Sequence, residues 1–323
     1  MKAYYLLAIC IWFVAAVIWL AAMPKVRARW LDYIYPVVPL GAAAVYLLLP
    51  VAAVEAVPWS AWLDSGIRLW LAVTAVWVVS VVMRDASVMD IAYGGAVAFV
   101  AWLQWHSGGA DTSAHTLLVL GAVTVWGLRN SAYIAWRNLP RGEDERYARW
   151  RARFGVRWWW WSYFQIFLLQ AVVIWIWYGP LAFALSVAGP VSPIEITAVA
   201  VWMVGFAFEA VGDTQLARFK SDPANRGKVL DTGLWSLTRH PNYFGEAAMW
   251  CGYFLFALRH PWGWLALACT AYTVWFMHRG SATSLLERHM HKTKPHYADY
   301  VARVPAFFPR LWPGSGQDGA VKS

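Results

Sequence analysis

Runs of about 20 consecutive apolar residues recur along this chain and constrain its fold more than any other feature. A helix of about 20 residues is needed to cross the roughly 30 Å hydrocarbon core of a bilayer. The chain is 60% hydrophobic and contains 25 tryptophans among 323 residues, which is too apolar for ordinary soluble domains. The sequence therefore predicts an all-α fold, a polytopic transmembrane helix bundle.

The predicted spans number about nine. They cover residues 4–23, 34–54, 63–83, 87–104, 116–136, 162–183, 194–217, 243–258 and 262–278. The fourth, eighth and ninth are short, so a bundle of eight spans is the alternative. The first run is longer than the core of a signal peptide, and Met23-Pro24-Lys25 lacks the small residues of a cleavage site, so we interpret it as a retained span.

Basic residues orient the predicted bundle, because they gather in every second loop. These basic segments are 25–29, Arg84, 137–157, 218–239 and the tail from Arg279 onward. Loops rich in lysine and arginine stay in the cytoplasm. The alternation therefore predicts an amino terminus outside and a carboxyl terminus in the cytoplasm.

The net charge of +9 is thus first a topology signal. A nucleic-acid interface is the competing interpretation, because aromatic and basic residues interleave over 149–161. The tryptophans at 158–161 fit an interfacial belt better, where an amphipathic segment meets the lipid headgroups. We expect membrane lipids as partners and no nucleic acid.

Several polar side chains fall inside predicted spans, where ionisable groups are costly and commonly mark functional sites. They are Asp90 with Tyr93, Arg129 with Asn130 and Tyr133, Glu209 with Asp213, and Asn242 with Glu246. A structural ion pair between Asp90 and Arg129 is the alternative interpretation. Most of the set falls in the predicted cytoplasmic half, as expected for a polar cavity that admits an anionic cofactor from the cytosol.

The segment 239–246 reads Arg-His-Pro-Asn-Tyr-Phe-Gly-Glu. Pro241 suits the first turn of a helix, and the free N–H groups of that turn would face Arg239 and His240, an arrangement that favours a phosphate. No GxxxxGK[ST] motif occurs, and the match to GxGxxG at 314–319 lies in the polar tail without a preceding strand-like run, so no P-loop or Rossmann fold is expected. A bound nucleotide would lie between membrane helices.

A metal site is not expected. The cysteines Cys10, Cys251 and Cys269 lie in apolar runs and are interpreted as small core residues. His289 and His291 are two residues apart, which does not place them on one helical face, and no cysteine is near. Glu287, in the same segment, is a candidate cofactor contact.

Three segments resemble the carboxy-terminal half of the steroid 5-alpha-reductase family, and most closely its bacterial branch. They are Asp231-Thr-Gly-Leu-Trp235, the segment 239–246, and the tail 294–305; the segments 209–215 and 141–147 match as well. The resemblance covers about residues 85–310, the expected reductase-like membrane domain. Residues 1–84 would then be additional amino-terminal helices and 311–323 a polar tail. We expect the protein to be a monomer in a bacterial inner membrane.

The resemblance implies NADPH-dependent reduction of a carbon–carbon double bond conjugated to a ketone, in a steroid or related lipid. The expected cofactor-binding residues are Arg129, Glu209, Asp213, Lys220, Lys228, Arg239, His240, Asn242, Tyr243, Glu246 and Glu287. Glu209 stands where the animal enzymes have an amide. Lys220 and Lys228 replace arginines, so they would neutralise phosphate without a bidentate fork.

The substrate side of the family pattern is altered. The family's tyrosine position falls on Trp126, which has no phenolic proton, and its glutamate position falls near Asp90. We predict that Asp90 with Tyr93 polarises the ketone, and Tyr133 is the other candidate for the missing hydroxyl. A donor aimed at the oxygen stabilises the enolate, and a buried carboxyl group keeps its proton more easily.

Two other functions compete with reduction. The segment 239–246 also resembles an element of isoprenylcysteine carboxyl methyltransferases, so methyl transfer from S-adenosylmethionine to a lipid or prenylated thiol is the first. The longer upstream match favours reduction. The second is a non-catalytic lipid-binding or transport protein, which predicts that Asn242→Ala and Glu246→Ala leave function intact.

Overall fold

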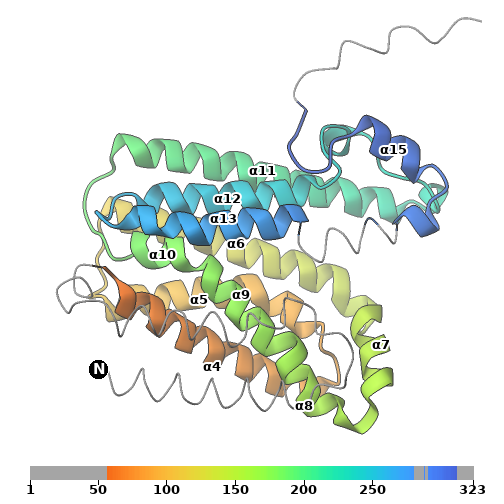
Figure 1. The fold of residues 1–323 in the computed structure, drawn as a ribbon, viewed down its shortest axis with the longest axis horizontal. Coiled ribbons are helices and arrows are strands. Elements are labelled where there is room, and N and C mark those ends of the chain that lie inside the picture. Colours follow the sequence, from red (N-terminus) through yellow and green to blue (C-terminus); the bar gives the residue numbers. More distant parts are fainter. Residues whose placement is uncertain (1–56, 280–286, 288–289, 311–323) are drawn as a thin grey trace, which may run out of the picture. The chain divides into compact units, whose positions relative to one another are not determined.

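The computed structural model describes residues 57–279, residue 287 and residues 290–310, and within these ranges it contains helices and no strand. The α-helices, drawn in Figure 1, are α4 (Trp59–Met83), α5 (Val88–Ser107), α6 (Ala114–Asn138), α7 (Glu145–Phe154), α8 (Trp158–Ser162), α9 (Leu169–Trp177), α10 (Gly179–Ala184), α11 (Pro193–Ser221), α12 (Pro241–Ala257), α13 (Leu267–Arg279) and α15 (Tyr297–Arg303). Shorter turns are η2 (Leu139–Arg141), η3 (Gly155–Arg157), η4 (Tyr163–Leu168), η5 (Pro223–Asn225), η6 (Gly233–Ser236) and η7 (Gly263–Ala266).

The membrane architecture is confirmed. In the described part of the chain, 5 helices are long and apolar enough to cross a bilayer: 59–83, 88–107, 114–141, 145–177 and 193–221. The predicted spans 243–258 and 262–278 correspond to α12 and α13, helices of 17 and 13 residues. The predicted spans 4–23 and 34–54 lie outside the described residues. The total of about nine spans stays a prediction.

One predicted span is divided in the structure. The apolar run 162–183 contains the end of a helix at Trp177 and a second, short helix that starts at Gly179. Pro180 has no backbone N–H and cannot continue the preceding helical hydrogen bonds. Before that break, the six residues of η4 form a π-helical turn. A hydrophobic run therefore marks an apolar segment and does not show where its helix ends.

The chain divides into two compact units. The first contains residues up to Ser192 together with Phe256–Cys269, and the second contains Pro193–Leu255 and the residues from Thr270 onward. The predicted domain boundary at residue 84 falls inside the first unit, between α4 and α5, which pack against each other. Each unit is described by itself below.

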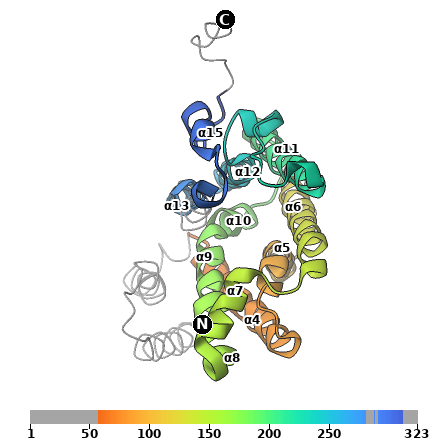
Figure 2. The same cartoon turned by 90° about the vertical axis from the view of Figure 1, so that its right-hand side faces the viewer.

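In the first unit α5 lies between α4 and α6, as Figures 1 and 2 both show. Glycine permits the close approach of α5 and α6: a Cβ atom on Gly127 would lie 2.5 Å from the carbonyl oxygen of Gly94. Small residues let membrane helices approach until their backbones touch. Helix α4 packs on α9 through the stacked rings of Trp62 and Trp175, each of which donates its indole N–H to the other's carbonyl oxygen.

Candidate functional site

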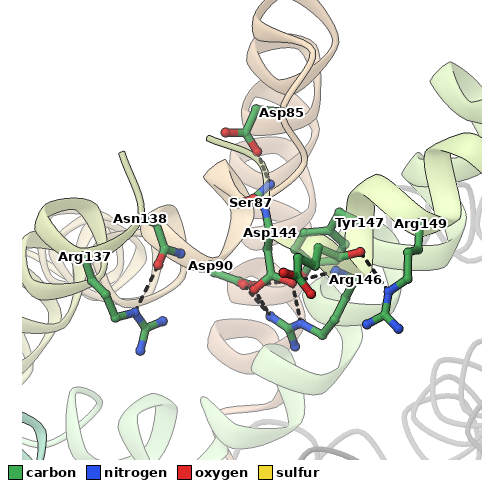
Figure 3. A network of polar contacts seen from close by, with 10 residues as sticks. Asp85, Ser87, Asp90, Arg137, Asn138, Asp144, Arg146, Tyr147 and Arg149 are labelled. Atoms are coloured by element: carbon green, nitrogen blue, oxygen red, sulfur yellow. Dashed lines mark hydrogen bonds and ion pairs between the residues drawn. The ribbon is translucent and has the colours of Figure 1, made fainter. Parts of the chain in front are cut away.

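Asp90, a predicted catalytic residue, lies in the first turn of α5 and contacts α7 (Figure 3). The Tyr147 hydroxyl donates a hydrogen bond to Asp90 Oδ1 over 2.9 Å, and Arg146 Nη2 donates to Asp90 Oδ2 over 3.2 Å. Tyr147 is buried. Both carboxyl oxygens of Asp90 therefore accept hydrogen bonds from α7.

The residues before α7 extend this network. The backbone N–H of Asp144 donates to Ser87 Oγ over 2.7 Å. Glu143 Oε1 accepts the N–H of Ala86 over 2.9 Å, and the Glu143 carboxylate takes two hydrogen bonds from Arg151, of 2.8 and 2.9 Å. The set formed by Ser87, Asp90, Glu143, Asp144, Arg146, Tyr147 and Arg151 is called the α7 clasp below. It fixes the polar loop before α7 to the start of α5.

The two candidate tyrosines are held by rings and cations. The Tyr93 ring packs edge-on against Trp126 and Trp177, with ring centroids 5.5 and 6.1 Å apart. Tyr133 lies beneath the Arg129 guanidinium, whose carbon is 5.0 Å from the ring centroid. Such contacts stabilise a fixed ring orientation.

The second cluster lies in the second unit, where α11 and α12 cross. A Cβ atom on Gly245 would lie 2.5 Å from both the carbonyl oxygen of Gly205 and the amide nitrogen of Glu209. Farther along, a Cβ atom on Gly252 would lie 2.9 Å from the Trp202 Cβ. The pairing of 205 with 245 and of 202 with 252 makes the two helices antiparallel, and only glycine allows this backbone contact.

Three carboxylates occupy the same crossing. Glu209, Asp213 and Glu246 are 4%, 6% and 8% exposed, and Asn242 Nδ2 donates to Asp213 Oδ1 over 3.2 Å. Residues four apart share a helical face, which applies to Glu209 with Asp213 and to Asn242 with Glu246. We call these four residues the acidic seam. The structure therefore brings four of the predicted cofactor-binding residues to one helix crossing.

Sequence reasoning missed a residue of this crossing. Tyr253 is 0% exposed and lies among Trp202, Glu209 and Glu246. It follows Glu246 by seven residues, which is two helical turns and the same face. That spacing was the available signal, but a tyrosine in an apolar run also fits an ordinary core position.

Arg239 and His240 of the same segment contact the tail of the chain. Arg239 Nε and Nη2 lie 3.0 and 2.9 Å from Glu287 Oε1, and Arg239 Nη1 donates to the carbonyl oxygens of Val301 and Val304 over 3.3 and 2.8 Å. His240 Nε2 lies 3.1 Å from the same Glu287 oxygen. Arg239, His240, Glu287 and these two carbonyl groups form the tail clasp.

The tail clasp is electrostatic. Hydrogen bonds from His240 and Arg239, together with the Arg239 charge, outweigh burial and lower the pKa of Glu287 to about 2. Tyr300 adds a neutral hydrogen bond of 2.7 Å to the carbonyl oxygen of Trp235, whose indole N–H donates to Gly212 of α11 over 3.0 Å. The segment before α12 is thereby fixed to both α11 and α15.

Lys220, Lys228 and Tyr243 are further predicted cofactor-binding residues of the second unit. Lys220, in the last turn of α11, and Lys228, in the following loop, are exposed. The Tyr243 ring stacks on His240 with centroids 5.5 Å apart. Within the ranges that the structure describes, no group of three or more His, Cys, Asp or Glu side chains is placed to hold a metal ion, and His289 lies outside those ranges.

Fold and site define the chain as a helical integral membrane protein with buried carboxylates. A family model described as a protein of unknown function, DUF1295, matches residues 76–304. The chain belongs to this family, whose members are membrane proteins related to steroid 5-alpha-reductase. The match covers the α7 clasp, the acidic seam and the tail clasp.

A search of curated proteins found a similar segment in an uncharacterized protein of Schizosaccharomyces pombe. The two are 31% identical over 120 residues, which are 35% of this chain and 34% of that protein. The match thus spans about a third of the relative. No solved structure matches the chain.

Proposed function

We propose that the protein is a membrane-embedded reductase that uses NADPH to reduce a carbon–carbon double bond conjugated to a ketone in a steroid or related lipid. The acidic seam supports the proposal: three carboxylates are buried at one helix crossing. Buried charges are costly in membrane helices and commonly mark a functional site. The residues of the seam belong to the segments 209–215 and 239–246, which carry the resemblance to the reductase family.

The side chains of the seam suit part of such a cofactor. Carboxylates accept hydrogen bonds from ribose hydroxyl groups, as an acidic residue does in dinucleotide-binding folds, and the Asn242 amide can donate as well as accept. Phosphate groups require cations, which the exposed Lys220 and Lys228 offer as point charges.

Arg239 takes a different role in the proposal. Its donors already meet Glu287, Val301 and Val304, so we assign it to positioning the tail beside the start of α12. His240 and Glu287 share this role. In the proposal, Lys220 and Lys228 therefore bind the phosphate groups that were expected at the start of α12.

The chemical step requires a proton donor at the ketone oxygen. The nicotinamide, when bound, supplies the hydride. As negative charge builds on the substrate oxygen, a hydroxyl aimed at it stabilises the enolate. The two oxygens of Asp90 already accept hydrogen bonds from Tyr147 and Arg146. We therefore give the donor role to Tyr93 or Tyr133 and regard Asp90 as the anchor of the helix that carries Tyr93.

A methyltransferase is the second candidate, and the gathering of three acidic side chains in the seam is the observation that favours it. Three carboxylates at one crossing also suit the cationic sulfonium and ammonium groups of S-adenosylmethionine. The segment 239–246 resembles both enzyme classes. The two candidates therefore differ in the cofactor that the seam accepts.

The test is turnover by the purified full chain in nanodiscs, with a panel of 3-oxo-4-ene steroids and prenyl enones. We expect loss of nicotinamide absorbance that depends on both NADPH and an enone. Glu209→Gln and Asp213→Asn should lower it at least about tenfold, since each removes a charge-assisted contact. Thr214→Ala is the matched control, because Thr214 is exposed on α11 and its hydroxyl donates to a carbonyl group of its own helix. Methyl transfer from S-adenosylmethionine with no enone-dependent oxidation would exclude the proposal.

A further inference from the structure

A polar cavity of about 420 Å³ in the first unit is not used by the proposed function. Its walls are the first turns of α4, the last turn of α5, the segment leading into α6 and the residues after α10. The α7 clasp lies at the opposite ends of α4 and α5, so the two sites are separated by the length of a membrane-spanning helix. The volume falls within the roughly 300–1,000 Å³ of ligand pockets.

One wall of the cavity, formed by α4, carries two charged residues of opposite sign. Arg68 Nη2 donates to Ser107 Oγ over 3.0 Å, which links α4 to the end of α5. Asp64 precedes Arg68 by four residues, so both side chains project from one face of α4. A cation and a carboxylate thus line the same wall.

The lining also contains a second carboxylate and an aromatic ring, those of Asp111 and Trp105. Asp111 Oδ2 accepts hydrogen bonds from the Ser113 hydroxyl, the Ser113 N–H and the Thr116 hydroxyl, at 2.5, 3.1 and 2.7 Å. These bonds hold the pKa of Asp111 below its usual range. The indole N–H of Trp105 donates to the backbone carbonyl oxygen of Asp111 over 2.6 Å, which links the ring to the Asp111 backbone.

The floor of the cavity is rigid. Gln104 is 6% exposed, donates to the carbonyl oxygen of Ala182 over 3.0 Å and accepts a hydrogen bond from the Tyr178 hydroxyl over 3.0 Å. His115, next to the cavity, is fully buried and lies 2.8 Å from the Ala184 carbonyl oxygen. Helices α5, α6 and α10 are therefore tied together beneath the polar walls, as in a preformed binding site.

We propose that this cavity binds the zwitterionic headgroup of a phospholipid, with the phosphate on Arg68 and Ser107 and the ammonium group on Asp64, Asp111 and Trp105. Guanidinium groups bind phosphate with charge-assisted hydrogen bonds, and carboxylates with an aromatic face recognise ammonium groups. One cation and two carboxylates line the cavity, so a purely anionic headgroup fits it poorly. The walls are ends of membrane helices, where headgroups are abundant.

The test uses the purified full chain in detergent micelles doped with either phosphatidylethanolamine or phosphatidylglycerol of the same acyl chains. The readout is the Tm, since a ligand that binds only the folded state raises it. A third arm uses soluble O-phosphoethanolamine, which carries the same phosphate and ammonium groups without acyl chains. It distinguishes a lipid from a soluble solute as the source of this chemistry.

We expect phosphatidylethanolamine, and not phosphatidylglycerol, to raise the Tm. Arg68→Gln should weaken the apparent affinity about tenfold, and Ser107→Ala, which keeps the charge, should weaken it less. Arg84→Gln, at the opposite end of α4, should keep the full shift. A rise in Tm with O-phosphoethanolamine and with neither lipid supports the phosphate and ammonium contacts and identifies the ligand as a soluble compound. Equal shifts with both lipids, or an unchanged shift in Arg68→Gln, would overturn the proposal. None of these readouts involves NADPH or an enone, so the proposed function can fail without affecting them.

Discussion

The α7 clasp and the acidic seam both hold carboxylates on long apolar helices, but they stabilise them in different ways. In the clasp, Asp90 of α5 pairs with Arg146 of α7 at 3.2 Å, and Glu143 pairs with Arg151 at 2.8 Å while it accepts the N–H of Ala86 before α5. In the seam, the carboxylates are more deeply buried, Asp213 accepts from the amide of Asn242, and the helices touch through glycine backbones. Ion pairing of the first kind joins two structural elements. Burial of the carboxyl groups in the seam costs free energy, and helix packing alone does not require it. The seam is therefore the better candidate for ligand binding.

The largest loss of stability is expected from a substitution that fills the glycine contact between α11 and α12. Gly245→Ala would place a methyl group 2.5 Å from two backbone atoms of α11. Backbone atoms cannot rotate away, so we expect a loss at or above the roughly 1–3 kcal/mol typical of overpacking. Thermal unfolding and recovery of monodisperse protein in detergent measure it.

A matched glycine tests whether the position of Gly245, and not the change from glycine to alanine, causes the expected loss of stability. A Cβ atom on Gly121 of α6 would meet no atom of a neighbouring element within 4 Å. Gly121→Ala should be neutral, or stabilising by up to about 1 kcal/mol because alanine favours helix. Equal loss of stability in both variants would mean that the α11–α12 contact is not specially close.

The tail clasp gives the next largest effect. Arg239→Ala removes the cation that Glu287 contacts and two hydrogen bonds to carbonyl groups. Loss of hydrogen bonds to a charged group costs about 1.5–3 kcal/mol. Cleavage of the tail near α15 by a protease should accelerate in the variant. Cleavage at the wild-type rate would contradict the clasp.

Low pH should weaken the tail clasp over a defined pH range. The pKa of Glu287 is lowered from the ordinary value of 4.5 to about 2 in the folded protein. Its stabilising contribution is therefore complete above pH 4.5 and is lost as the pH falls toward 2. Hydrogen exchange of α15 should rise over that range in the wild type. In Glu287→Gln, which cannot titrate, this step should be missing.

The smallest effect is expected in the α7 clasp. Tyr147→Phe removes the hydroxyl that donates to Asp90 and leaves Arg146 in place. One hydrogen bond contributes about 0.5–1.5 kcal/mol, so Tm should fall slightly while cofactor binding stays unchanged. A large loss of NADPH affinity in this variant would place the clasp inside the functional site.

Hydrophobic run lengths predicted α4, α5, α6 and α11, because the bilayer thickness sets the length of an apolar helix. They could not reveal the break before α10, which depends on Gly179 and Pro180. The acidic seam was predicted as a set of residues from family resemblance and helical spacing. The glycines that create the crossing recur at intervals of seven, 205 with 212 and 245 with 252, and this visible signal was not used.

The two clasps could not be predicted from local pattern. Tyr147 and Asp90 are 57 residues apart, and Arg239 and Glu287 are 48 apart. No helical periodicity connects residues at such separations, because the contacts depend on how loops return to helix ends. The sequence likewise does not show that Tyr147 and Arg146 contact Asp90, and the role of Asp90 with Tyr93 in polarising the ketone stays a prediction.

The central claim is that the acidic seam holds NADPH, and ligand-dependent thermal unfolding tests it most directly. The purified wild type should gain stability with NADPH, by about 2.7 kcal/mol at a concentration of 100 times Kd, and none with S-adenosylmethionine. Glu246→Gln should lose most of the gain, while Tyr147→Phe keeps it. Stabilisation by S-adenosylmethionine and none by NADPH would contradict the account.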